Sequence, residues 1–139
     1  MLDKTNITEL VRSQLPDSYD PLNLTFGYEQ ASPVDSAVAI GSDYGTTICV
    51  DLQSEHVIAI DRAGVYRTRF MNSSIPQLAQ CIAAHRDYCD WMIRTRAESE
   101  ELSVVSDFRD RLLDTDRAAL DNTENWWSVI VEQAETGQL

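Results

Sequence analysis

The chain is poor in the two residues that most often interrupt regular structure, with 5 glycines and 4 prolines among 139 residues. Low-complexity and collagen-like architectures are therefore excluded. The chain also has no apolar run of 18 residues or more, so we expect no membrane span. The N-terminal stretch MLDKTNITELVRSQL is charged and has no apolar signal core. These absences predict a cytoplasmic protein that does not enter membranes.

Cysteine and histidine are scarce as well, with three and two copies. The cysteines are odd in number and have no CxxC spacing, which favours reduced, mostly buried thiols over disulfides. No Walker loop, dinucleotide-binding fingerprint or HExxH motif occurs. We therefore predict no cofactor and no metal, and an enzyme, although still possible, has no recognisable site in the sequence.

Acidic residues outnumber basic residues by 23 to 11. The formal net charge is −12, and residues 98–139 hold eleven acidic side chains against three arginines. Such a surface repels nucleic acid and attracts basic proteins. The 43% hydrophobic content is enough for a core, and the length suits one domain over residues 1–139.

Short β-branched stretches separated by turn residues fill the first half of the chain. They predict strands at 22–28, 36–41, 46–52, 56–61 and 65–71. The connections between them are short, so we expect hairpins and an antiparallel sheet of five to six strands. A helix should precede the sheet, capped by Asn6 with Glu9 in capping-box position.

From residue 74 the apolar spacing changes to three and four, which predicts helices at 74–94 and 98–113. A last helix should carry Trp126 and Trp127 and be capped by Asn122 or Thr123. The order of helix, sheet and helices predicts an α+β fold, with the N-terminal helix and the C-terminal helices packed on the sheet.

The stretch FMNSSIPQLAQCIAAH predicts a corner from strand to helix. Ser74 and Gln77 form a capping box, and Asn72 and Ser73 should hold the corner by side-chain to backbone hydrogen bonds. A nucleophile elbow would need glycines on both sides of the serine, and neither is present. We therefore interpret Phe70, Asn72, Ser73 and Ser74 as a structural corner. A hydrolase that uses Ser74 or Cys49 remains a distant alternative.

Three other groups of side chains are candidates for chemistry. Zinc needs a fourth ligand beyond Cys81, His85 and Cys89, and these three share the apolar face of a helix. Cys49 lies in an apolar run, which argues against a nucleophile paired with a histidine of the same hairpin. The acidic connector after residue 113 lacks the glycine and glutamate that an EF-hand loop requires.

The segments AIGSDYGTTICVDLQSEHVIAI, FMNSSIPQLAQCIAAH and LDTDRAALDNTENWWSVIVEQAETGQL resemble the SUKH superfamily, and most closely its fourth subfamily of bacterial immunity proteins. The residues at matching places are Gly45, Asp51, Phe70, Asn72, Ser73, Ser74, Ala119, Leu120 and Trp127. The chain departs from the pattern in three places. Ile75 replaces a leucine, the turn QSEH lacks a glycine, and His85 stands where an aromatic residue is common.

The resemblance implies a non-catalytic cytoplasmic domain that binds and neutralises a toxin from neighbouring cells, commonly a nuclease or a deaminase. The net charge of −12 adds the expectation that this toxin is basic. We also expect the chain to be a monomer, with a dimer left open. Two surfaces could contact it: the turn Asp43-Tyr44, and the acids Glu98, Glu100, Glu101, Asp107, Asp110, Asp114 and Asp116. The alternative is a regulatory or scaffolding module that binds a cellular protein.

Overall fold

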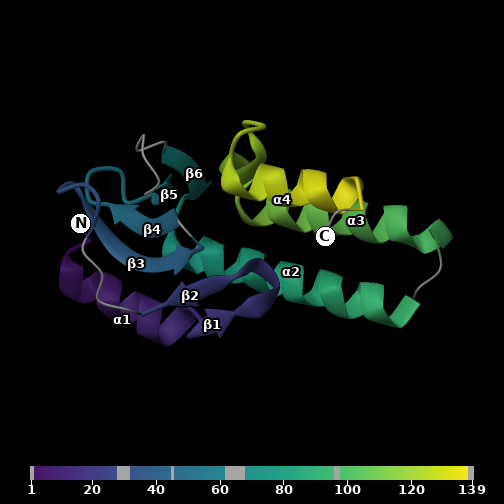
Figure 1. Cartoon of the computed structure of the whole chain (residues 1–139), viewed down its shortest axis with the longest axis horizontal. Helices are drawn as coiled ribbons and strands as arrows, with labels where there is room; N and C mark the ends of the chain where they lie inside the picture. Colours follow the sequence, from purple (N-terminus) through teal and green to yellow (C-terminus); the bar gives the residue numbers. More distant parts are fainter. Residues whose placement is uncertain (1, 28–31, 45, 62–67, 96–97, 138–139) are drawn as a thin grey trace.

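The computed structural model describes residues 2–27, 32–44, 46–61, 68–95 and 98–137, and of residues 95 and 98–103 it describes only the backbone. These residues form one sheet and four α-helices (Figure 1). The strands are β1 (Ser18–Tyr19), β2 (Leu24–Phe26), β3 (Ala37–Asp43), β4 (Thr46–Asp51), β5 (Val57–Asp61) and β6 (Thr68–Asn72). The helices are α1 (Lys4–Gln14), α2 (Ile75–Thr95), α3 (Glu98–Thr115) and α4 (Trp126–Glu135), with short 3-10 turns η1 (Asp20–Leu22) and η2 (Arg117–Leu120). The predicted α+β class is confirmed.

The sheet is an antiparallel meander in which the strands lie in the order of the sequence, β1 to β6. The expectation of five to six hairpin-linked strands is confirmed. The pattern gave no sign of β1, which is only two residues long and pairs Tyr19 with Leu24. Such a short strand is too brief to show alternation.

β3 extends beyond Gly41, where a turn was expected to begin. Gly41 pairs with Phe26 of β2, and a Cβ at this position would collide with the carbonyl oxygen of Thr25. The glycine therefore allows β2 and β3 to approach each other closely, and β3 continues to Asp43. A register shift between Ala39 and Gly41 accompanies it.

Two predicted helix caps are wrong. α1 begins earlier than expected because Asp3, and not Asn6, is the N-cap residue: its carboxylate accepts a hydrogen bond from the Asn6 amide at 2.9 Å. α4 begins later, after Asn125, whose side chain makes no cap and donates instead to the carbonyl of Ala118. The side chain of Asn122 accepts from the amide of Glu124 in a local turn.

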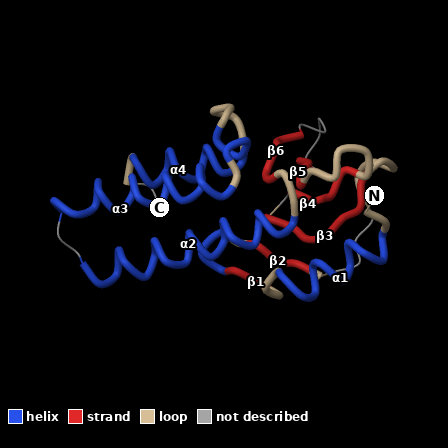
Figure 2. The backbone as a smooth tube through the Cα atoms, turned by 180° about the vertical axis from the view of Figure 1, so that it is seen from behind, coloured by secondary structure: helices blue, strands red, loops and turns tan. Residues whose placement is uncertain are grey.

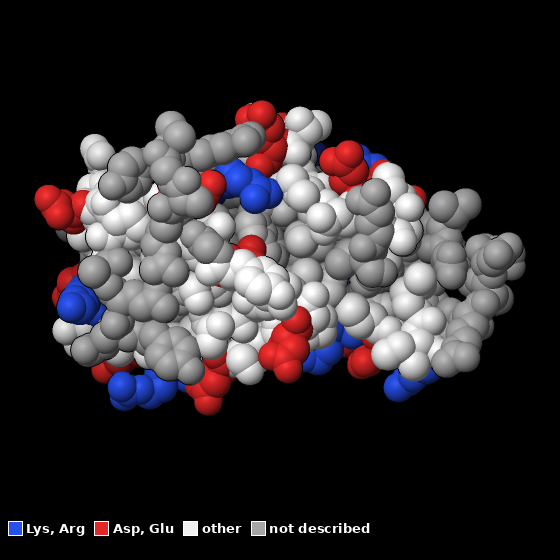
Figure 3. Space-filling model, viewed as in Figure 1, with Lys and Arg blue, Asp and Glu red and all other residues white. Residues whose placement is uncertain are grey.

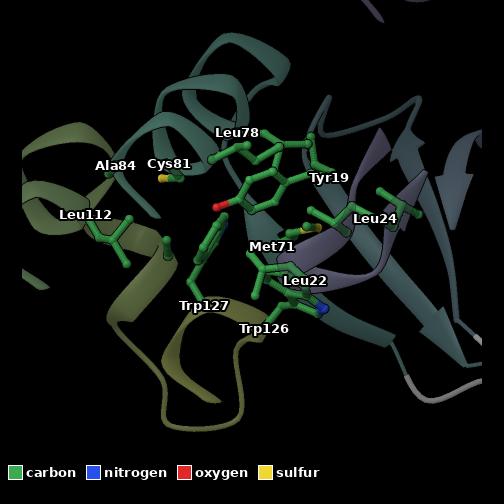
Figure 4. Close-up of a cluster of buried hydrophobic side chains, with 14 of the residues drawn as sticks. Tyr19, Leu22, Leu24, Met71, Leu78, Cys81, Ala84, Leu112, Trp126 and Trp127 are labelled. Atoms are coloured by element: carbon green, nitrogen blue, oxygen red, sulfur yellow. The ribbon is translucent and has the colours of Figure 1, made fainter. Parts of the chain in front are cut away.

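The sheet and α1 lie at one end of the molecule (Figures 1 and 2). α2 runs from the sheet to the opposite end, where the chain returns as α3, and α4 lies against α3. The main core fills the space between sheet and helices, where Figure 4 shows side chains of Tyr19, Leu78 and Trp127 converging. A smaller cluster of Ala37, Cys49 and Ile60 forms a second core. In the described part of the chain, no helix is both long and apolar enough to cross a membrane.

Candidate functional site

The corner between β6 and α2 begins with the expected capping box. The Ser74 hydroxyl accepts a hydrogen bond from the Gln77 amide at 3.3 Å and donates to Gln77 Oε1 at 2.7 Å. Gln77 Nε2 in turn donates to the carbonyl of Thr115 at the end of α3. Ser74 thus caps the start of α2, and Gln77 links this cap to the end of α3.

Asp116, which follows Ser73 by 43 residues in the sequence, binds the other polar groups of the corner. Its Oδ2 accepts the Ser73 amide at 2.7 Å and the Asn72 side chain at 3.0 Å, and its Oδ1 accepts the Ser73 hydroxyl at 2.8 Å. Asp116 is 4% exposed. The expectation that Asn72 and Ser73 hold the corner through backbone groups is therefore wrong, because their partner is a distant carboxylate. Burial and these three hydrogen bonds also remove Asp116 from the acids that could face a partner.

Trp127 completes the network. Its indole nitrogen donates to Asn72 Oδ1 at 2.8 Å, and the Asn72 amide also lies 3.4 Å from Cys81 Sγ. Asn72 and Trp127 are fully buried, and Phe70 packs edge-on against His56 at 5.2 Å between ring centroids. Every polar atom of the Asn72 side chain has a partner, which is what a buried amide requires. The corner is therefore a structural joint between β6, α2, η2 and α4.

The thiols have the electrostatics of core residues. Burial raises the pKa of Cys49, Cys81 and Cys89, that of Cys81 to about 12. A catalytic cysteine needs the opposite shift. Among the described residues, no three His, Cys, Asp or Glu side chains come close enough together to hold a metal ion.

His85 is a buried neutral histidine. It is 1% exposed, and burial lowers its pKa to about 4. The Tyr19 hydroxyl lies 2.7 Å from its Nδ1, and the ring makes a T-shaped contact with Phe108. Burial likewise raises the pKa of Tyr19. His85 thus joins β1, α2 and α3, as a core aromatic residue would.

The tip of the β3–β4 hairpin differs from the corner because it displays a large side chain. Tyr44 is 80% exposed and has a positive φ of 49°. Its neighbour Asp43 accepts a hydrogen bond from the Trp126 indole at 3.0 Å, and burial raises the pKa of that carboxyl. The sequence pointed to the turn itself, but it placed Trp126 only in an apolar face and so missed the bond that fixes the turn to α4.

Three of the predicted acids lie along one side of α3, and three more have side chains outside the described residues. Asp107, Asp110 and Asp114 are exposed on α3, while the side chains of Glu98, Glu100 and Glu101 lie outside the described residues. On the face shown in Figure 3, acidic side chains are scattered near the rim and the middle is mostly uncharged. On this face, negative charge therefore forms no single block.

The sequence that forms this corner and this hairpin tip matches a known protein family. Residues 5–133 match the model of a family described as SUKH-4 immunity protein. The chain belongs to the SUKH-4 immunity protein family. Comparison with curated proteins gave no match, and comparison with solved structures also gave none. For this SUKH-4 chain, the family supports a role in toxin immunity, and the partner has to be inferred from the surface.

Proposed function

We propose that this SUKH-4 chain is a non-catalytic immunity protein that neutralises a toxin by binding to it. It acts as a monomer in the cytoplasm of the cell that it protects and needs no cofactor. The buried Cys49 thiol and the Ser74 hydroxyl, which is taken up by Gln77, support binding over hydrolysis.

The observation that carries the proposal is the display of Tyr44. An exposed tyrosine offers a large, rigid, amphipathic surface, and such residues dominate binding energies at interfaces. Asp43, directly before Tyr44, is bound to Trp126 of α4, so this side of the turn is anchored before a partner binds. A left-handed backbone at a residue other than glycine is strained, and strain of this kind is often retained where function needs it.

The net charge of −12 supports a basic partner such as a nuclease, whose substrate cleft is positive. The same charge disfavours binding to nucleic acid, which the chain would repel. We place the exposed acids of α3 on the approach side of the partner, beyond the contact made by Tyr44.

The proposal is tested by capturing the partner and then challenging it. Tagged protein is incubated with lysate of its source organism at low and moderate salt, and bound proteins are identified by mass spectrometry. The captured protein is then produced in cells with and without this chain. A stoichiometric partner whose toxicity the chain suppresses supports immunity. A housekeeping partner favours the regulatory alternative, and a toxin that remains toxic contradicts the proposal.

The electrostatic part is tested separately by charge reversal. Changing Asp107, Asp110 and Asp114 to Lys should slow association with a basic partner by about tenfold at low salt, because steering weakens. The control triple reverses three exposed acids elsewhere: Asp17, Asp35 and Glu135. Equal association rates for the two triples would show that the acids of α3 have no special position.

A further inference from the structure

A groove of about 260 Å³ lies between α2 and α3, away from the corner and the hairpin tip. Six of its lining residues carry the inference: Asp87, Tyr88 and Trp91 of α2, and Asp107, Phe108 and Arg111 of α3. The volume is below the range of about 300–1,000 Å³ typical of small-molecule sites. It is suited to a single large side chain.

The apolar part of the groove is aromatic and rigid. Tyr88 and Phe108 stack with ring centroids 4.9 Å apart and an interplanar angle of 21°, and both are buried. Trp91 lines the groove with 48% of its surface exposed. The face of a tryptophan ring attracts a cation more strongly than that of other aromatic residues.

The charged part of the groove already binds a guanidinium group. Arg111 Nη1 lies 2.8 Å from Asp87 Oδ2, so an arginine of α3 reaches across to α2. The two side chains are 50% and 63% exposed. An ion pair this exposed contributes little to stability, so its arginine can be exchanged for another. The exposed Asp107 adds a second carboxylate to the same groove.

We propose that this groove receives an arginine side chain of the toxin. The incoming guanidinium contacts Asp107 and Trp91 and replaces Arg111 as the partner of Asp87. Arg111 thus acts as an internal competitor for the site. The inference rests on the proposed function, since it takes the partner to be a basic protein. A second copy of this chain is the poorer occupant, because two chains of −12 repel each other.

The test uses a probe that does not require the toxin to be known. The blocked peptide Gly-Arg-Gly is titrated to about 10 mM into the full chain, and the indole signal of Trp91, assigned with Trp91→Phe, is followed by NMR. The comparison peptide carries citrulline, which has the shape of arginine without its charge. The arginine peptide should shift the Trp91 signal in a saturable way and the citrulline peptide should not.

Variants then test the competition. Asp87→Asn should weaken peptide binding about two- to fivefold, and Arg111→Ala should strengthen it by a similar factor. Arg12→Ala on α1 makes the same change in net charge and should leave the affinity unchanged. No shift, equal shifts with both peptides, or equal affinities for Arg111→Ala and Arg12→Ala would each overturn the proposal. These readouts do not depend on whether a toxin is captured, so failure of the immunity function would be seen separately.

Discussion

Two turns of the same sheet show opposite uses of similar residues. At the corner after β6, the Asn72 side chain accepts the indole of Trp127; at the tip between β3 and β4, the Asp43 side chain accepts the indole of Trp126. The two tryptophans are adjacent in sequence, and their rings meet edge-on at 4.8 Å. At the corner the polar side chains of Asn72 and Asp116 are buried and paired, whereas the tip is tied to α4 through Asp43 and presents Tyr44 to solvent.

The difference teaches which of the two turns is available for binding. A polar group that is buried and fully paired stabilises the fold and has nothing left to offer a partner. A turn that is anchored at one residue and exposed at the next can offer that exposed side chain to a partner. The following predictions put this contrast to the test, from the largest expected effect to the smallest.

The first prediction concerns two ionisable groups: His85 of α2, the helix that follows the corner, and Asp43 at the hairpin tip. Burial lowers the pKa of His85 to about 4 in the folded state, whereas its ordinary pKa is 6.5. Between these two pH values, unfolding therefore takes up a proton. The free energy of unfolding should therefore fall by up to about 3 kcal/mol as the pH drops from 6.5 to about 4. Asp43 acts in the opposite sense, because its raised pKa favours the folded state as the pH falls.

The measurement is urea unfolding across this pH range with His85→Gln beside the native chain. The variant keeps a hydrogen-bonding group for Tyr19 but does not titrate, so the difference between the two curves should shrink as the pH falls. Parallel curves would mean that His85 takes up its proton without unfolding, and the corner side would then be less tightly closed than the structure shows.

The second prediction compares two acids close together in sequence. Asp116→Asn places an amide group against donors from Asn72 and Ser73 and should cost about 2–3 kcal/mol, because hydrogen bonds to a charged group are lost. Asp114→Asn, on the exposed side of α3, should change stability by less than about 0.5 kcal/mol. Denaturant unfolding measures both variants. Similar values for the two would contradict the assignment of Asp116 as the organiser of the corner.

The third prediction separates the two tryptophans. Trp127→Phe should cost about 1–3 kcal/mol, because Asn72 Oδ1 is buried and loses its only donor among the described contacts. Trp126→Phe should cost less than about 1 kcal/mol, because the partly exposed Asp43 carboxylate can bind water instead. Thermal unfolding of the pair at one pH decides the matter. The reverse order would show the tip, and not the corner, to be the more closed of the two.

The sequence predicted those features that depend on neighbouring residues. The alternation and the helical spacing of apolar residues predicted the strands and the long helices. The capping box of Ser74 and Gln77 predicted the start of α2. The turn at Asp43-Tyr44 was visible in the same way, from its position between two β-branched stretches.

The features that the sequence did not predict depend on partners far along the chain. Asp116 resembles any acid of a solvated connector until Ser73, 43 residues earlier, is brought against it. Trp126 and Asp43 are separated by 83 residues. Neither spacing follows from local pattern. Asn6 was mistaken for a cap for another reason: both Asp3 and Asn6 are good N-cap residues, and the sequence pattern alone does not distinguish them.

The most direct test of the central claim, that the hairpin tip serves binding and not folding, is Tyr44→Gly. Glycine adopts a positive φ without strain, so the free energy of unfolding should stay the same or rise by up to about 1 kcal/mol. Binding to the captured toxin should nevertheless weaken at least tenfold, because an anchor of this kind contributes about 2 kcal/mol or more. Unchanged affinity in a stably folded variant would contradict the account and place the interface elsewhere on the molecule.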